Sequence, residues 1–176
     1  MKADKEIPAQ VEAHATKITQ SAGQTVRALE EIVWALRPGS DTLQSLVEYV
    51  SHFANELFEG DHTRCRLDFP HDLPSRPLPP EMRHNIFLIV KEALTNALKH
   101  AEAKEVHVQA KILPAAIELT VQDDGTGFNT SCASSNGRRR HGLDNMHRRA
   151  EAMKAALTVE NDHGTRVKLI VPFPEH

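Results

Sequence analysis

The chain has 176 residues, 40% of them apolar, which suits one domain with a single buried core and room for an appendage. A formal net charge of -3 excludes a strongly basic nucleic-acid binder judged by bulk charge. No run of about 20 apolar residues could span a membrane, and the charged N-terminus does not resemble a secretory signal. The two cysteines, Cys65 and Cys132, lie too far apart for a short metal motif, so we expect a cytoplasmic α/β protein.

The first predicted element is one long helix over residues 7–36. Pro8 suits its first turn, and no other proline occurs before Pro38. Residues on one side recur at alternating spacings of four and three, which is a heptad seam that requires a partner helix. We expect this helix to form a homodimer through residues 11–36, with packing against its own domain as the alternative. The seam consists of Val11, Ala15, Ile18, Ala22, Thr25, Leu29, Ile32 and Leu36.

A boundary follows at residues 37–40, where Pro38 and Gly39 interrupt the helical pattern. We therefore expect two parts, residues 1–38 and residues 39–176. Asp41 is a candidate N-cap for a helix whose apolar face runs over residues 43–57 and which Gly60 would end. A short strand is predicted over residues 65–69, and five prolines predict a loop over residues 70–80.

The remaining elements alternate between helices and strands. We predict a helix over residues 80–101, a strand pair over residues 106–112 and 117–121, and a loop over residues 125–141. A helix opening at His141 and Gly142 comes next, followed by strands over residues 157–159 and 167–171 with a turn between them. This order predicts an α/β fold with one sheet covered on one face by helices.

The first segment with chemical potential lies on the helix predicted over residues 80–101. Glu92, Asn96 and Lys99 occur at i, i+4 and i+7, so they share one helix face. A carboxylate, an amide oxygen and an ammonium group suit a water, a hard metal ion and phosphate oxygens. By itself, however, the segment is more typical of a solvated polar face.

The second segment, residues 123–128, directly follows a predicted strand. Gly125 and Gly127 allow a ligand to lie against backbone that carries no Cβ. Asp123 at the strand end can accept a hydrogen bond from an exocyclic amine, and it would select adenine because guanine presents a carbonyl there. A polar turn is the alternative.

The third segment, residues 141–146, opens a predicted helix after a cationic loop that contains Arg138, Arg139 and Arg140. A helix N-terminus with Gly142 is an anion site through its free N–H groups. The loop would close over phosphates as a lid. The alternatives are a solvated loop or a small nucleic-acid patch, and without nearby aromatic residues we expect no nucleic-acid partner.

Taken in order, these segments resemble the ATP-binding domain of bacterial sensor histidine kinases. That domain has the Bergerat fold, which gyrase, mismatch-repair and heat-shock-chaperone ATPases share. Residues 92–100 look like the asparagine box, residues 123–128 like the first glycine box, and Gly142-Leu143 and Gly164-Thr165 like the later glycine elements. Residues 31–38, 41–43, 99–101 and 142–146 are similar to the nitrate-sensor and thermosensor subgroup.

The resemblance implies a two-layer α/β sandwich with a mixed sheet, a long N-terminal helix, and a site for ATP and Mg²⁺. On the phosphate side, Asn96 would ligate Mg²⁺, and Glu92 would orient or polarise a water or the attacking group. Lys99 and His100 would contact phosphate or ribose. On the purine side, Asp123 would bind the adenine amine, Gly125 and Gly127 would leave room for the ring, and Thr165 would contribute through a water molecule. Gly142 and the loop before it would move with the nucleotide, and Leu143 would be a further nucleotide-binding residue.

The implied reaction transfers the γ-phosphoryl group of ATP to a histidine of the kinase dimer, for relay to a response regulator that usually binds DNA. In the family, the phosphoacceptor histidine lies on the helix before this one, in an Arg-rich stretch ending in His-Asp. His14 lacks that context. Residues 7–36 therefore look like only the second helix of a dimerisation hairpin, within a larger sensor whose membrane attachment the sequence does not give. The dimerisation hairpin of that larger sensor would be a partner of this domain.

One alternative function keeps the fold and changes the activity. A non-catalytic or serine-directed regulator of the anti-sigma type would use the same scaffold. The intact Glu92, Asn96 and Asp123 argue against a degenerate site.

Overall fold

The computed structural model of the chain describes residues 3–37, 41–127, 137–161 and 163–174. Side chains at 3–10, 13, 20, 24, 27 and 137–140 lie outside that description. The chain divides into two compact units, Met1–Arg37 and Pro38–His176, and each is described by itself.

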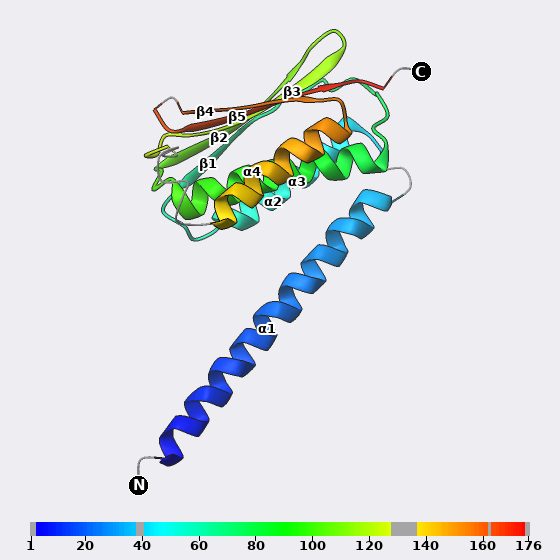
Figure 1. The fold of residues 1–176 in the computed structure, drawn as a ribbon. Coiled ribbons are helices and arrows are strands. Elements are labelled where there is room, and N and C mark those ends of the chain that lie inside the picture. The colour runs from blue at the N-terminus through cyan, green and yellow to red at the C-terminus, as the bar shows by residue number, and fades with distance from the viewer. Residues whose placement is uncertain (1–2, 38–40, 128–136, 162, 175–176) are drawn as a thin grey trace. The chain divides into compact units, whose positions relative to one another are not determined.

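The first unit is a single helix, α1, which spans Ala3–Leu36 (Figure 1). This confirms the predicted long helix. Most of the large apolar side chains that the structure describes in α1 are exposed in the single chain, and Ile18 is 68% exposed. Five of them belong to the predicted seam and two, Val26 and Val33, lie beside it. The exposed set is Val11, Ile18, Val26, Leu29, Ile32, Val33 and Leu36.

The second unit begins with helix α2, Leu43–Phe58. Its N-cap is Thr42, whose side chain accepts a hydrogen bond of 3.2 Å from the backbone N–H of Ser45. The predicted cap at Asp41 is therefore wrong, because an N-cap side chain must reach the N–H two or three residues ahead and the helix starts at Leu43. The carbonyl of Asp41 instead accepts a bond of 2.7 Å from the N–H of Leu78.

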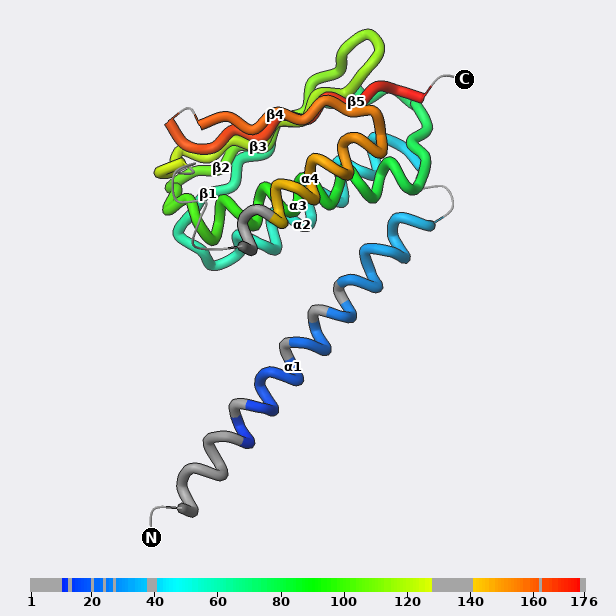
Figure 2. Tube along the Cα trace, viewed as in Figure 1, coloured from blue at the N-terminus to red at the C-terminus, as the bar shows by residue number. Residues whose placement is uncertain are grey.

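Five strands form one sheet in the order β1-β2-β3-β5-β4. The strand β1 is parallel to β2, and the other neighbours are antiparallel, so the sheet is mixed. Helices α2, α3 and α4 cover one face of it (Figures 1 and 2), as predicted. The bounds are β1 Arg64–Asp68, α3 Pro80–His100, β2 Glu105–Ile112, β3 Ala116–Asp123, α4 Gly137–Ala152, β4 Ala156–Asn161 and β5 Thr165–Pro172.

The core lies between the sheet and these helices, and alternation along the strands explains it. In β3, Ile117, Leu119 and Val121 are buried, while the residues between them are partly exposed. Because successive strand side chains point to opposite faces, one face of the sheet is apolar and packs on the helices. The helix α3 supplies the opposite layer with a buried face that includes Ile86 and Leu94.

The start of α4 differs from the prediction. The helix begins at Gly137, four residues before His141, so part of the predicted loop is helical; residues 128–136 lie outside the described residues. The first free N–H groups of a helix belong to its first four residues. Gly142 lies inside α4, so the predicted anion site at a helix N-terminus formed by Gly142 is wrong.

Among the helices of the described segments, none has the length and apolar character that a membrane span needs.

Candidate functional site

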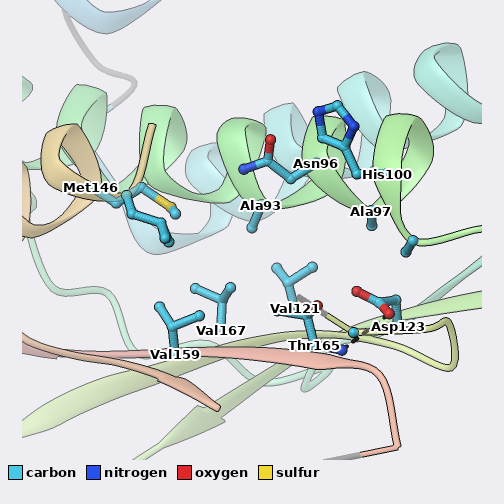
Figure 3. Close-up of a pocket in the computed structure, with 13 residues that line it drawn as sticks. Ala93, Asn96, Ala97, His100, Val121, Asp123, Met146, Val159, Thr165 and Val167 are labelled. Carbon is cyan, nitrogen blue, oxygen red and sulfur yellow. Dashed lines mark hydrogen bonds between the residues drawn. The ribbon is translucent and has the colours of Figure 1, made fainter. Parts of the chain in front are cut away.

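A pocket lies between α3 and the inner face of the sheet, with α4 at one end (Figure 3). The helix α3 and its C-cap contribute one wall, and β3, β4 and β5 contribute the opposite wall. The lining residues are Ala93, Asn96, Ala97, His100, Ala101, Val121, Asp123, Gly127, Leu143, Met146, Val159, Thr165 and Val167.

Asp123 is the last residue of β3 and the acidic group of the sheet wall. It is only 4% exposed, and its carboxylate extends from the sheet into the pocket (Figure 3). Its Oδ1 accepts two backbone hydrogen bonds, one of 3.0 Å from the N–H of Gly125 and one of 3.1 Å from the N–H of Thr165. A carboxylate oxygen without a protein donor can accept a bond from a ligand. Because both bonds end on Oδ1, the geometry leaves Oδ2 for a ligand donor.

The loop after β3 is attached to the end of α3. The N–H of Thr126 donates a hydrogen bond of 2.9 Å to the carbonyl of Ala101. Gly125 packs so tightly on that same carbonyl that a Cβ would collide with it. The loop can therefore lie against the helix only because residue 125 is glycine.

The same loop also meets the turn between β4 and β5. Gly127 has φ +71°, and a Cβ there would collide with the amide oxygen of Asn161. Gly164 has φ +125°, and a Cβ there would collide with the carbonyl of Asp123. Both positions combine a left-handed backbone with a close contact, so each requires glycine on two grounds.

The helix wall carries a polar pair. Asn96 lines the pocket, and its Nδ2 donates a hydrogen bond of 3.3 Å to Oε1 of Glu92. Glu92 is half-buried and is not a lining residue. Its Oε1 lies against Gly142 of α4, where a Cβ would collide with it.

The structure brings most of the predicted site residues together. Glu92, Gly125 and Gly142 do not line the pocket but contact residues of the site or of its walls. Lys99 is exposed and is not a lining residue. The predicted residues that line the pocket are Asn96, His100, Asp123, Gly127, Leu143 and Thr165.

The apolar walls of the pocket were not predicted from the sequence. Ala93, Ala97 and Ala101 line the pocket at i, i+4 and i+8 of α3, and Val121 and Val167 face them from the sheet. These residues have the same spacing as ordinary core residues, so periodicity alone assigns them to the core. Three small residues in one stripe are the signal that could have found them, because alanine leaves space that a larger side chain would fill.

Asp124, next to the site, has a different environment. Its Oδ1 accepts bonds of 2.8 and 2.9 Å from the N–H groups of Lys104 and Glu105. These backbone donors, that of Glu105 foremost, hold the pKa of the Asp124 carboxyl below its ordinary value. Asp124 does not line the pocket, so it ties β2 to the end of β3 instead.

The residues of the pocket fit a hard cation only in part. Asn96 offers an amide oxygen, which is a suitable donor for Mg²⁺. Over the described segments, no three His, Cys, Asp or Glu side chains gather in a way that could hold a metal ion. A cation here would therefore share its coordination with oxygens of a ligand, as happens when Mg²⁺ binds with a nucleotide.

Comparison with known sequences agrees with this arrangement. A family model described as "Histidine kinase-, DNA gyrase B-, and HSP90-like ATPase" matches residues 82–175. The nitrate/nitrite sensor protein NarX of Escherichia coli K12 is 32% identical over 108 residues, which is 61% of this chain and 17% of NarX. The histidine-protein kinase/phosphatase DegS of Bacillus subtilis is 28% identical over 97 residues, which is 55% of this chain and 25% of DegS. The chain thus spans a quarter or less of the length of these relatives.

Comparison with solved structures shows the same fold. A blue-light activated histidine kinase of Erythrobacter litoralis has a TM-score of 0.66 at 22% identity, covering 98% of this chain and 64% of that one. The ATP-binding domain of PrrB from Mycobacterium tuberculosis has a TM-score of 0.59 at 24% identity, covering 76% of this chain and 96% of that one.

Proposed function

Because the chain belongs to the histidine kinase-, DNA gyrase B- and HSP90-like ATPase family, we propose that it is the catalytic part of a sensor histidine kinase. In this proposal the pocket binds ATP, and the γ-phosphoryl group passes to a histidine of the kinase dimer. DegS, which is named a signal transduction histidine-protein kinase/phosphatase, and NarX, which is named a nitrate/nitrite sensor protein, support this assignment.

The observation that carries the proposal is a single cavity shared by Asp123 and Asn96. An adenine ring between the alanine stripe of α3 and Val121 would direct its amine to the Asp123 carboxylate. The phosphates would then extend toward Asn96 and α4. Apolar walls with a few polar groups at defined positions are typical of small-molecule sites.

Asn96 is the residue that would hold Mg²⁺, together with phosphate oxygens of the nucleotide. When bound there, the ion supplies charge neutralisation at those oxygens. The rest of the chemistry is positioning: a nitrogen of the acceptor imidazole would attack the γ-phosphorus, the bond from that phosphorus to the β,γ-bridging oxygen would break, and ADP would leave. The proton on the other ring nitrogen would pass to water. Neutral imidazole is a nucleophile near neutral pH, which suits it to this role.

The acceptor histidine would come from the dimerisation hairpin of the parent kinase, and α1 would be the second helix of that hairpin. The phosphoryl group would then pass to a response regulator. This part of the parent protein would work in the cytoplasm, where ATP and the regulator are present.

Two measurements test the proposal. Calorimetric titration of the chain with ADP and with ATP, each in the presence of Mg²⁺, should show saturable binding. With labelled ATP, the chain should phosphorylate a separately supplied hairpin that carries the missing helix. The product should lose its label in acid, because phosphohistidine is acid-labile, whereas an acid-stable product would indicate transfer to serine. Absence of saturable nucleotide binding would refute the proposal.

A further inference from the structure

We propose that Glu92 is a positioning residue: it turns the Asn96 side chain so that the amide oxygen faces the cation bound with the nucleotide, and Gly142 of α4 keeps Glu92 in place. The inference rests on the proposed function, since it presupposes a nucleotide and Mg²⁺ in the pocket.

The orientation of the Asn96 amide follows from the chemistry of its neighbour. An ionised carboxylate only accepts hydrogen bonds, whereas an Asn side chain has one donor end and one acceptor end. Glu92 precedes Asn96 by four residues on α3, the spacing that brings two helical side chains together. The Nδ2 group therefore points to Oε1 of Glu92, at 3.3 Å, and the oxygen Oδ1 points away from it.

This orientation decides whether the side chain can ligate a cation. Mg²⁺ accepts oxygen ligands, and the NH₂ end of an amide cannot serve as one. Half a turn about the last bond of Asn96 exchanges the two ends. Without the carboxylate of Glu92, the pocket would lose the group that selects the competent orientation.

The position of Glu92 depends in turn on α4. A Cβ on Gly142 would collide with its Oε1, and its carboxyl carbon would be only 3.2 Å from that Cβ. Gly142 is buried, and the next residue, Leu143, lines the pocket together with Met146 of the same helix. The helix that restrains Glu92 is thus also a wall of the ligand site.

A role as a general base would require Glu92 to touch the reacting groups. Asn96 lines the pocket and Glu92 does not, and Glu92 is connected to the site by its hydrogen bond with Asn96. A group in that place acts through Asn96.

The test compares Glu92→Ala, Glu92→Gln and Gly142→Ala in the 176-residue chain. For each variant, calorimetry measures the affinity for ADP with saturating Mg²⁺ and again with a chelator. The affinity with Mg²⁺ divided by the affinity with chelator is called the Mg²⁺-dependent gain. In Glu92→Ala we expect this gain to fall about 10-fold, which is typical when a group that orients a metal ligand is lost. The affinity with chelator should stay within about 2-fold, since the purine contacts are intact.

Glu92→Gln should restore most of the gain, because its amide oxygen can still accept the bond from Asn96. Gly142→Ala should lower the gain like Glu92→Ala, although alanine favours the helix and the fold should not suffer. The double variant should be no worse than the single ones, because both act on one contact. Glu81→Ala and Asp144→Ala, exposed positions on the same two helices, are the matched controls and should behave like the unmodified chain.

Two results would overturn the inference. One is a Mg²⁺-dependent gain in Glu92→Ala equal to that of the unmodified chain. The other is a Glu92→Gln variant that keeps the gain but no longer phosphorylates the supplied hairpin, which would make Glu92 a proton acceptor at the reacting atoms. If the unmodified chain itself fails to bind ADP, the proposed function fails instead, so the two failures are distinguishable.

Discussion

At the scale of single residues, Asp123, the last residue of β3, and Asp124, the residue after it, show how position in the backbone separates the roles of two identical side chains. Asp123 is buried and lines the pocket, whereas Asp124 is exposed and accepts two backbone bonds from the start of β2. Neighbouring residues of a strand face opposite sides of the sheet. Only the residue that faces the helices can contribute to the pocket, although both have the same side chain.

Asp123→Asn should therefore weaken ADP binding about 10- to 100-fold, the effect of losing a hydrogen bond to a charged acceptor. The Asn oxygen can still accept the bonds from Gly125 and Thr165, which would leave an NH₂ group facing the adenine amine. The measurement is a calorimetric titration. Asp124→Asn is the matched control, with affinity within about 2-fold of the unmodified chain; an equal loss in both variants would contradict this assignment.

Asp124 also predicts a dependence of stability on pH. Its pKa in the folded chain is lowered by backbone hydrogen bonds, that of Glu105 foremost, from an ordinary value of about 3.9. A lowered folded-state pKa stabilises the fold above the unfolded pKa, and this contribution is lost as pH falls through the folded one. In urea unfolding between about pH 5 and about pH 2, Asp124→Asn should lose less stability than the unmodified chain. Asp72→Asn, in an exposed loop, should lose as much as the unmodified chain.

At the scale of elements, α1 differs from every other helix of the described part of the chain. Most of its described large apolar side chains are exposed in the single chain, while those of α2 and α3 are mostly buried. Seven large exposed apolar residues on one helix at heptad-like spacing are typical of a helix that pairs. The helix α1 is thus stabilised by contacts within its own sequence, but its apolar side is buried only when a second helix packs on it.

We expect Ile18→Asp to weaken self-association of the chain at least about 10-fold, because burying one Ile contributes about 1.5–3 kcal/mol. Ile18 lies in the seam and is 68% exposed in the single chain. Sedimentation over a range of concentrations measures the effect. Thr16→Asp, exposed and outside the seam, is the matched control and should dimerise normally; equal behaviour of the two variants would argue against the seam.

At the scale of the whole molecule, the pocket belongs to one unit. All of its lining residues lie between Ala93 and Val167, within the unit Pro38–His176. The unit Pro38–His176 contains the sheet, helices α2, α3 and α4 and their buried core, so we expect it to fold without α1.

A chain shortened to residues 38–176 should consequently bind ADP with an affinity within about 2-fold of the full chain. It should also lose self-association if that depends on α1. Calorimetry and sedimentation of the shortened chain measure both properties. Loss of nucleotide binding in a shortened chain that remains folded by circular dichroism would contradict the division.

The sequence by itself determined which elements form and which residues are candidates for the site. Periodicity placed the long helix, the helix that carries Asn96, and the paired strands, because these patterns reflect local geometry and burial. The order and spacing of the asparagine and glycine segments indicated a nucleotide site, although each segment by itself is also typical of a polar surface.

Only the tertiary structure decided which residues meet. The N-cap of α2 is Thr42 and not Asp41 as predicted. Gly142 was predicted at a helix N-terminus, but it lies inside α4 in close contact with Glu92. The three alanines Ala93, Ala97 and Ala101, which have the spacing of core residues, line the pocket. Such features depend on contacts between residues far apart in the chain and on how closely the packed elements approach one another. A one-dimensional pattern contains neither kind of information.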